Sequence, residues 1–278
     1  DTKNSKIQSK ISSAGKLQSS IANIDDILKK FNYQAGKMAL AGVEVKSSDS
    51  SLSVSVVGSD VLTGTNDITI SQLASSHRLA SDISIADPSA VIGSGTLTIN
   101  YGTVSGEVFN NTTGKYTSAT YTSNKTFTIN LTNSSLTDIK NKINESGAAR
   151  ASIVNDGTGY KLTIQSSESG TSGVLKISNS GDVALSNLLD YAPDGVQNFK
   201  QTQHGKNLIA NVNGVDITQK SNEIIGIDGL RAVASKTGDF SITASVNTEG
   251  ISKELEKFVT AWNSFNSTFR QETGYGQT

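Results

Sequence analysis

Few residues of this chain combine the types and the spacing that chemistry requires. Histidine occurs twice, at His77 and His204, and cysteine does not occur, so a metal site would need carboxylates to join the histidines. Serine and aspartate are abundant enough for a Ser-His-Asp triad, but no Gly-x-Ser-x-Gly turn presents a serine as a nucleophile. We therefore expect no enzyme, with no catalytic residue, no cofactor-binding residue and no metal ligand.

One turn allows a second chemical interpretation. The segment Asp156-Gly157-Thr158-Gly159 places a carboxylate and a hydroxyl beside two glycines, which is compatible with a calcium or phosphate site. The same residues also suit the connection of a plain β-hairpin, because Asp-Gly pairs favour tight turns. No Gly-rich loop of the Walker type occurs. We favour the hairpin and expect no cofactor.

The composition limits the partners that the chain can have. It has 278 residues, of which 35% are hydrophobic, and its formal net charge is -1. A nucleic-acid-binding protein would carry a basic face, and this charge balance does not predict one. No stretch approaches the roughly 20 apolar residues that a membrane-spanning helix needs. We therefore expect no nucleic-acid partner and no membrane insertion.

Both ends of the chain carry helical periodicity. Near the N-terminus, apolar residues recur at steps of four and three, until Gly36 and Gly42 weaken the pattern. The first helix is predicted to end between these glycines, in a flexible stretch. Near the C-terminus, the steps alternate without error after a cap at Asn247 or Thr248. The stripe residues expected to pack are Ile21, Ile24, Leu28 and Phe31 in the first helix, and Ile251, Leu255, Phe258, Trp262, Phe265 and Phe269 in the second.

Two apolar stripes at opposite ends of one chain can bury each other in a helical leg. Burying a large side chain such as Trp262 is worth roughly 1.5–3 kcal/mol, which favours packing of one end on the other. A second interpretation stays open, in which part of the stripes contacts a neighbouring subunit or another protein. Both hold where one stripe is wider than the other can cover. On this view Phe265 and Phe269 bind partner helices.

The residues between the two helices indicate mainly strands, because apolar side chains alternate with Ser, Thr and Asn. The alternating segments are residues 52–56, 68–74, 97–101 and 127–131. Asp156-Gly157 and Asn213-Gly214 each predict a hairpin turn. Residues 230–234 are expected to pair with residues 240–246 in a further hairpin. The middle of the chain is therefore predicted to be rich in β-structure.

One helix interrupts these strands. Its apolar residues recur at helical spacing after a cap at Ser134 or Ser135. Asp138 follows Ser135 by three residues, as in a capping box, and Gly147 can end the helix. The helix lies within residues 87–201, which we interpret as an insertion.

The predicted fold class is α+β, with a coiled-coil-like leg from both chain ends and two β-rich head domains, the outer one inserted in the inner one. Residues 1–47 and 248–278 would form the helical leg domain. Residues 48–86 and 202–247 would form the inner β-rich head domain. Residues 87–201 would form the outer α+β head domain.

Three tyrosines, Tyr101, Tyr116 and Tyr121, lie in a polar segment of the outer head. Tyrosine is enriched at contact surfaces because it adds area at low entropic cost. These residues are candidates for a head contact surface that meets a neighbour or a host. Packing along an edge strand is the alternative, and it is the one we favour.

Several segments, taken in order, carry a resemblance to a known family. They are GTNDITISQLA at 64–74, IGSGTLTI at 92–99, SLTDIKNKIN at 135–144, ASIVNDG at 151–157, NVNGV at 211–215 with SNE at 221–223, and FVTAWN at 258–263. This set resembles the flagellar filament cap protein (FliD, flagellar hook-associated protein type 2) over nearly the whole chain. Trp262 replaces the family's usual Tyr, and the extended segment 103–125 puts the shape of the outer head in doubt. The family's far terminal segments are expected to be absent here.

The resemblance implies a structural cap at the distal end of the bacterial flagellar filament, outside the cell. Such proteins are exported through the hollow filament and form homo-oligomeric rings of about four to six subunits. The ring retains exported flagellin and promotes its folding and insertion. The implied partners are further copies of the chain, flagellin, hook-filament junction proteins, and an export chaperone that binds a terminal segment expected to be absent here.

Two alternatives stay open. One is a surface adhesin-like module on a coiled-coil stalk, and the other is a different flagellar axial protein, such as flagellin or a hook junction protein. An adhesin predicts a head that binds glycan on a cell that swims without it. Flagellin predicts long polymers, whereas a cap predicts small closed rings.

Overall fold

A computed structural model describes residues 2–31, 33–34, 37–38, 43–58, 61–227 and 229–274. The chain divides into two compact units. The first contains residues 1–46, 58–65 and 243–278, and the second contains residues 47–57 and 66–242. Helices and antiparallel sheets together confirm the predicted α+β class. The division into leg, inner head and outer head stays a prediction.

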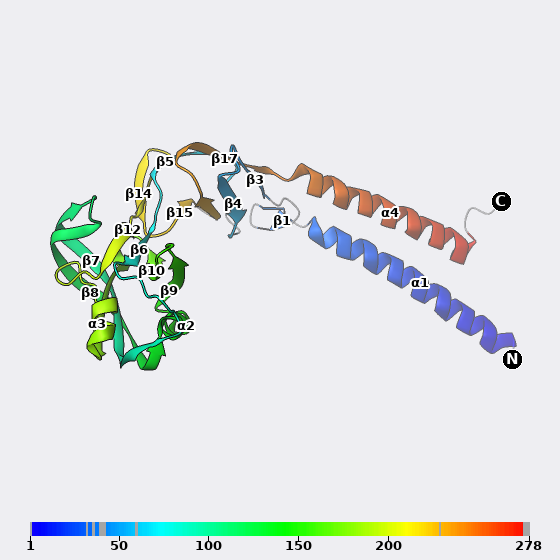
Figure 1. The fold of residues 1–278 in the computed structure, drawn as a ribbon. Helices are drawn as coiled ribbons and strands as arrows, with labels where there is room; N and C mark the ends of the chain where they lie inside the picture. The colour runs from blue at the N-terminus through cyan, green and yellow to red at the C-terminus, as the bar shows by residue number, and fades with distance from the viewer. Residues whose placement is uncertain are drawn as a thin grey trace. The chain divides into compact units, whose positions relative to one another are not determined.

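Two long helices dominate the first unit. α1 (Thr2–Lys30) and α4 (Thr248–Thr273) lie side by side and run antiparallel (Figure 1), and the end of α4 lies beside the middle of α1, where Glu272 contacts Ser13 and Lys16. The Asn247 side chain caps α4 by accepting a 2.9 Å hydrogen bond from the Gly250 N–H, which confirms the predicted cap. Among the described residues, no helix has a stretch apolar enough to cross a membrane.

The end of α1 differs from the prediction. The helix ends at Lys30 rather than between Gly36 and Gly42, and those two glycines lie outside the described residues. The Phe31 N–H bonds to the Leu28 carbonyl in a closing turn. The chain then enters a short antiparallel ladder of β1 (Tyr33–Gln34) and β2 (Lys37–Met38). The helical pattern therefore stops with its last apolar residue and does not continue to the glycines.

Two sheets share the strands nearest to the helices in sequence. The five-stranded sheet has the order β14-β13-β5-β17-β3, and the three-stranded sheet has the order β15-β16-β4. The β13–β14 turn has φ of 51° at Asn213 and 86° at Gly214, which confirms the predicted Asn-Gly hairpin. The strand bounds are β3 Val43–Ser47, β4 Leu52–Val56, β5 Gly64–Gln72, β13 Leu208–Val212, β14 Val215–Gln219, β15 Glu223–Ile227, β16 Leu230–Ala234 and β17 Gly238–Val246.

The predicted pairing of residues 230–234 with residues 240–246 is wrong. β16 pairs with β15 and β4, whereas β17 belongs to the five-stranded sheet. Both strands bury alternate residues, as at Ala232 and Ile242, so each has one apolar face. Alternation determines which face of a strand is buried but not which strand lies beside it. The connection between the two strands thus crosses from one sheet to the other.

Two further sheets enclose the largest core. One has the order β12-β6-β10-β9 and the other β11-β7-β8. β6, which the sequence analysis assigned to the inner head, pairs with β10 of this body instead. The Asp156-Gly157 hairpin between β9 and β10 is confirmed. The strand bounds are β6 Ser76–Ser81, β7 Val91–Asn110, β8 Lys115–Ser135, β9 Ala149–Asn155, β10 Tyr160–Ser169, β11 Val174–Gly181 and β12 Phe199–Gln203.

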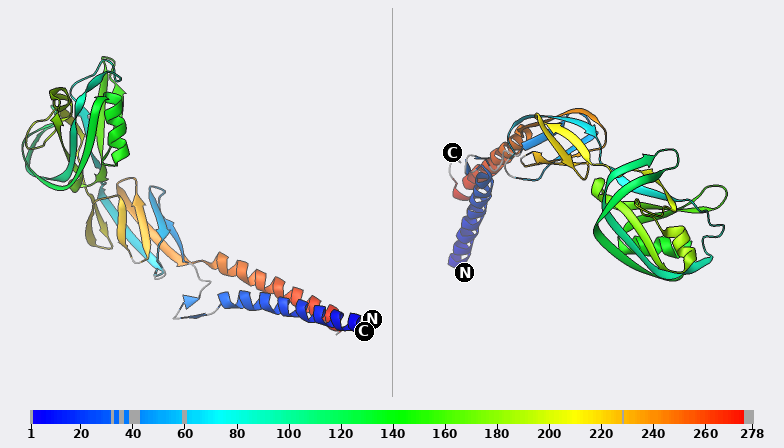
Figure 2. Two further views of the ribbon diagram at one scale, coloured as in Figure 1. Left: turned by 90° about the horizontal axis from the view of Figure 1, so that it is seen from below. Right: turned by 90° about the vertical axis from the view of Figure 1, so that its left-hand side faces the viewer.

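Two helices complete this body. α2 (Leu136–Ser146) lies against its strands (Figure 2) and buries Leu136, Ile139 and Ile143 completely. Ser135 and Asp138 form the predicted capping box, and Gly147 ends the helix with φ of 67°. α3 (Val183–Leu189) adds three buried leucines, and a single 3-10 turn, Thr171–Gly173, precedes β11.

A buried histidine joins three strands of this core. The Leu175 N–H donates a 3.1 Å hydrogen bond to His77 Nδ1, so the proton of the neutral ring sits on Nε2. Nε2 then donates to Gln201 Oε1 at 2.9 Å, and the Gln201 amide donates in turn to His204 Nδ1. Protonating His77 would put a proton on Nδ1 against the Leu175 N–H. Burial, the largest cause, lowers the pKa of His77 to about 4.

This network predicts a loss of stability in acid. Because the pKa of His77 is near its usual 6.5 in the unfolded chain and about 4 when folded, the folded state is favoured above pH 6.5 and loses that advantage as the pH falls toward 4. The free energy of unfolding should drop by up to about 3 kcal/mol across this window. Urea unfolding of the chain at pH 7, 5.5 and 4.5 measures it.

The matched variant is His77→Gln, whose amide can accept from Leu175 and donate to Gln201 without titrating. It should show a smaller fall than the natural chain over the same pH values. Equal falls in the two proteins would mean that carboxylates, and not His77, set the acid sensitivity.

Candidate functional site

The two histidines, which were the candidates for catalysis or metal binding, have structural roles. His77 and His204 belong to the buried hydrogen-bond network described above. His204 also packs edge-to-face on Phe109, with ring centroids 4.4 Å apart. Across the described ranges, no group of three or more His, Asp and Glu side chains could hold a metal ion.

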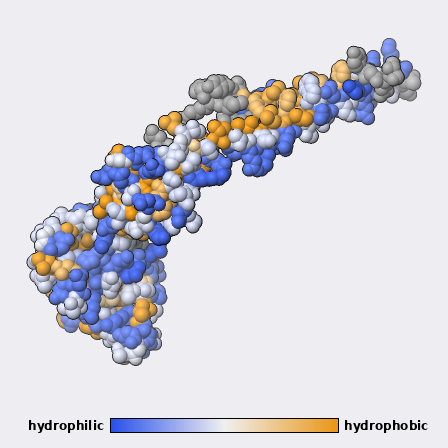
Figure 3. Space-filling view, turned by 90° about the horizontal axis from the view of Figure 1, so that it is seen from above, coloured by the Kyte–Doolittle hydropathy of each residue, from blue (hydrophilic) through white to orange (hydrophobic). Residues whose placement is uncertain are grey.

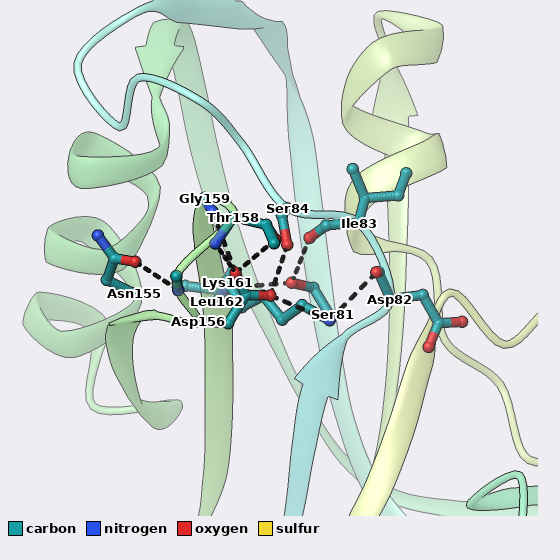
Figure 4. A network of polar contacts seen from close by, with 11 residues as sticks. Ser81, Asp82, Ile83, Ser84, Asn155, Asp156, Thr158, Gly159, Lys161 and Leu162 are labelled. Carbon is teal, nitrogen blue, oxygen red and sulfur yellow. Dashed lines mark hydrogen bonds and ion pairs between the residues drawn. The ribbon is translucent and has the colours of Figure 1, made fainter.

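The Asp156 turn also has a structural explanation. Asp156 Oδ1 accepts hydrogen bonds from the Thr158 and Gly159 N–H groups and from the Thr158 hydroxyl, at 2.7–3.0 Å (Figure 4). Oδ2 accepts from the Ser84 hydroxyl at 2.9 Å. The Thr158 hydroxyl, followed by the Thr158 N–H, holds the pKa of the Asp156 carboxyl well below its usual range. The carboxylate therefore closes the hairpin, which is the interpretation favoured from the sequence.

The three tyrosines do not form an exposed surface. Tyr101 is 1% exposed, and its hydroxyl bonds to the Ala148 carbonyl and the Ser167 N–H. Tyr116 is also buried, and Tyr121 is half-buried with its hydroxyl donating to the Val174 carbonyl at 3.1 Å. Burial of Tyr101 and Tyr116 contradicts their interpretation as a contact surface. Tyr101 instead links β7 to Ala148 and to Ser167 of β10, and Tyr121 links β8 to Val174 of β11.

The helical leg carries the remaining predicted site residues. Its two helices meet along a seam, in which the less exposed residues of each helix recur at steps of four and three. On α1 the seam residues are Ser13, Leu17, Ser20, Ile24, Ile27 and Phe31. On α4 they are Glu254, Phe258, Ala261, Phe265, Thr268 and Glu272. Ile24, Ile27 and Ala261 are buried at its centre.

Only part of the predicted stripe lies in this seam. Ile24, Phe31, Phe258 and Phe265 do, and Ile251 is half-buried near the start of α4. The other members are substantially exposed. They are Ile21 (55%), Leu28 (48%), Leu255 (49%), Trp262 (48%) and Phe269 (38%).

Two of the three buried seam residues, Ile27 and Ala261, escaped the sequence analysis. Each is followed in the chain by a larger or equally apolar residue, Leu28 or Trp262, which the sequence analysis assigned to the packed face. A signal in the sequence could have identified Ala261. Glu254 and Thr268 lie seven residues before and after it, so the three residues occupy the same heptad position. Glu254 and Glu272 meet Lys30 and Lys16 across the helices, at 3.2 and 2.6 Å.

Most of the exposed apolar residues of the two helices share one flank of the leg, and Ile11 and Val259 are the exceptions. In heptad terms, each residue of this flank follows a d position, so it occupies an e position. In an antiparallel pair, the e positions of both helices lie on the same side. We call this side the e-flank, and it consists of Ile7, Ala14, Ile21 and Leu28 of α1 with Leu255, Trp262 and Phe269 of α4. Figure 3 shows hydrophobic residues gathered along the helices.

The opposite flank is polar. Its residues precede the seam in the heptad and include Lys16, Asn23, Lys30, Lys257 and Ser264. Lys257 binds Glu254 at 2.6 Å, beside the ion pairs that cross the helices. A shallow hollow on this side is lined mainly by charged and polar side chains. The leg therefore has one apolar and one charged flank.

An antiparallel pair of helices with an exposed apolar flank is typical of a protein that binds partners through contacts. Residues 1–77 match the family model described as "Flagellar hook-associated protein 2 N-terminus". The B-type flagellar hook-associated protein 2 of Pseudomonas aeruginosa is 26% identical over 95% of this chain and 55% of its own length. The flagellar hook-associated protein 2 of Salmonella typhimurium is 30% identical over 51% of this chain and 31% of its own.

Solved structures share the fold. The D1-D2-D3 domains of the flagellar cap protein FliD from Escherichia coli superpose with a TM-score of 0.72 at 23% identity, covering 95% of this chain and 70% of that one. FliD (HAP2) from P. aeruginosa superposes with a TM-score of 0.58 at 24% identity, covering 80% of this chain and 96% of that one. The matches show that the chain is similar to flagellar hook-associated protein 2, which confirms the resemblance found in the sequence. The chain spans only about half of the length of the Pseudomonas relative.

The seam and the e-flank predict opposite responses to truncation. Ile24→Ala removes buried methylene groups, and we expect it to destabilise the helical leg by about 2–3 kcal/mol. Ile21→Ala, on the e-flank, should change the stability by less than about 1 kcal/mol because its side chain is already half in water. Thermal unfolding followed by the helical circular dichroism of the two variants compares them. Equal destabilisation would show that Ile21 is packed within the chain.

Proposed function

We propose that this chain is part of a cap subunit at the distal end of the bacterial flagellar filament. In this role, a ring of subunits retains exported flagellin and promotes its folding and insertion. The names of the relatives support the proposal, since two are called flagellar hook-associated protein 2 and one a flagellar cap protein. The observation in the structure that carries it is the apolar e-flank of the leg.

The e-flank suits contact with a helical partner. Ile21, Leu28, Leu255 and Trp262 each leave about half of their side chain in water, although neither helix lacks apolar residues in its own seam. Covering what remains exposed would be worth roughly 1 kcal/mol for each residue. An amphipathic helix that lies along this flank would contact both α1 and α4, as the third helix of a coiled coil. We propose the helical segments of flagellin as that partner.

A set of modest contacts also fits a cap that must let subunits pass. Four residues that each contribute about 1 kcal/mol form a weak contact, which can be broken and formed again. The buried interface between obligate subunits is larger and stays closed. The Trp262 ring contacts Phe258 and Phe265, with centroids 6.4 and 5.9 Å away. It is therefore held in place before a partner arrives, which lowers the entropic cost of binding.

The first experiment tests the cap itself. In the source cell, the full-length gene is deleted, the medium is assayed for unpolymerised flagellin, and the cells are examined for filaments. Flagellin in the medium and bald cells, both reversed by restoring the gene, are the expected result. Normal filaments and normal motility without the gene would overturn the proposal and would favour the adhesin alternative.

The second experiment tests the e-flank within that gene. Leu255→Glu with Trp262→Glu places two charges on the flank and leaves every seam side chain in place, and we expect filament assembly to be lost while the helical circular dichroism is retained. The control is Ser264→Glu with Gln271→Glu, which adds the same charge to the opposite flank and should restore filaments. Filaments in both strains would rule out this flank as the contact, while leaving the deletion result unaffected.

A further inference from the structure

One row of side chains crosses the open face of the β12-β6-β10-β9 sheet. Gln165 on β10 is paired with Arg78 on β6 and with Arg150 on β9. Directly paired residues point to the same face of a sheet, so the three side chains stand in line. The adjacent residues Leu79 and Ile164 point to the other face, into the core. The two arginines therefore flank one glutamine on the solvent side.

Neither guanidinium is neutralised by a carboxylate. Arg78 and Arg150 are both exposed, and among the described residues no Asp or Glu oxygen lies within 4.0 Å of either. Arg231, by contrast, is paired with Glu223. Arg78 is nevertheless directed, because its Nη2 donates a 3.0 Å hydrogen bond to Gln165 Oε1. That bond turns the Arg78 side chain toward the middle strand and leaves the Gln165 amide N–H groups to donate.

A hollow of about 390 Å³ lies between the two arginines. Ser152 and Thr163 line it, with their hydroxyl oxygens 2.6 Å apart, and Val154 lies at its apolar end. Two more cations stand on the same face, Lys161 opposite Val154 and Lys200 opposite Ala80. Asp156 lies 3.7 Å from Lys161 and partly offsets it. The face thus combines an excess of positive charge with hydroxyl and amide donors.

We propose that this hollow binds a tetrahedral oxyanion, a sulfate or phosphate group. Neighbouring strands lie about 4.8 Å apart, so the backbones of Arg78 and Arg150 are roughly 10 Å apart and their side chains can close on one group above Gln165. One guanidinium fork satisfies the two oxygens of a carboxylate. Two forks, the Gln165 amide and the one hydroxyl of the Ser152–Thr163 pair that does not donate within the pair match the larger number of acceptors on a tetrahedral group. The lysines add attraction for an anion that belongs to a longer polyanion.

The test uses the 278-residue chain. It is titrated with sodium sulfate and with sodium phosphate, and sodium chloride at equal ionic strength is the control. Backbone amide resonances of residues 78, 150 and 165 report the binding. We expect saturable shifts with sulfate or phosphate and none with chloride. Arg78→Gln with Arg150→Gln should weaken binding at least tenfold. Lys6→Gln with Lys10→Gln, which removes the same charge from exposed sites on α1, should leave it unchanged.

Shifts that do not saturate, or that are the same in the double arginine variant and the natural chain, would overturn the proposal. If that variant fails to fold, Arg78→Lys with Arg150→Lys keeps the charge and loses both forks, and it should still weaken binding severalfold. A second titration with dextran sulfate, using neutral dextran as the control, identifies the source of the anion. Binding at least tenfold tighter per sulfate would indicate an ester on a polymer, and equal binding would indicate the free ion.

Discussion

The structure depends on one pairing, that of the first helix with the last. Because α1 and α4 run antiparallel along a single seam, the chain leaves the helical leg after Phe31 and must return to it at Asn247. All of the described strands therefore lie in one segment of the chain, and the paired helices hold both ends of that segment. The ion pairs Lys16–Glu272 and Lys30–Glu254 hold the two helices in register, since a shift of one heptad would separate both. Exposed pairs contribute little stability, so their main effect is on register.

The composition of the seam explains why an apolar flank is left over. The d positions of α4 are Glu254, Ala261 and Thr268, which are small or polar beside the large residues that follow them. Ala261 lets the helices approach closely, and Ile24 and Ile27 pack against it. The larger residues Leu255 and Trp262 would hold the helices apart if they faced α1. A coiled coil in which the d positions of one helix are small or polar, while the larger residues beside them stay exposed, is organised for a partner as well as for itself.

The sheets face a related problem, because an exposed strand edge pairs readily with other chains. Three edges are closed by side-chain amides that imitate a neighbouring strand. The Asn144 amide both donates to and accepts from the Ala151 backbone on β9. Gln197 does the same for Tyr116 on β8, and Gln219 for Ile225 on β15. Each amide satisfies the backbone groups of one edge residue, which makes that point of the edge less available to a strand of another chain.

The sequence alone could predict features that depend on neighbouring residues, but not those that depend on contacts between distant segments. The capping box at Ser135, the cap at Asn247 and the Asn213-Gly214 turn were predicted correctly, because a few adjacent residues satisfy their own backbone groups. The pairing of β16 was not, since both of its candidate partners present the same alternation and only the packing of distant segments chooses between them. The same limit applies to the leg. Ile27 and Leu28 are adjacent and nearly equal in hydrophobicity, so periodicity cannot decide which one faces α4. The small side chain of Ala261 decides it, 234 residues beyond Ile27 in a chain of 278, and by turning Leu28 outward it also determines where a partner can bind.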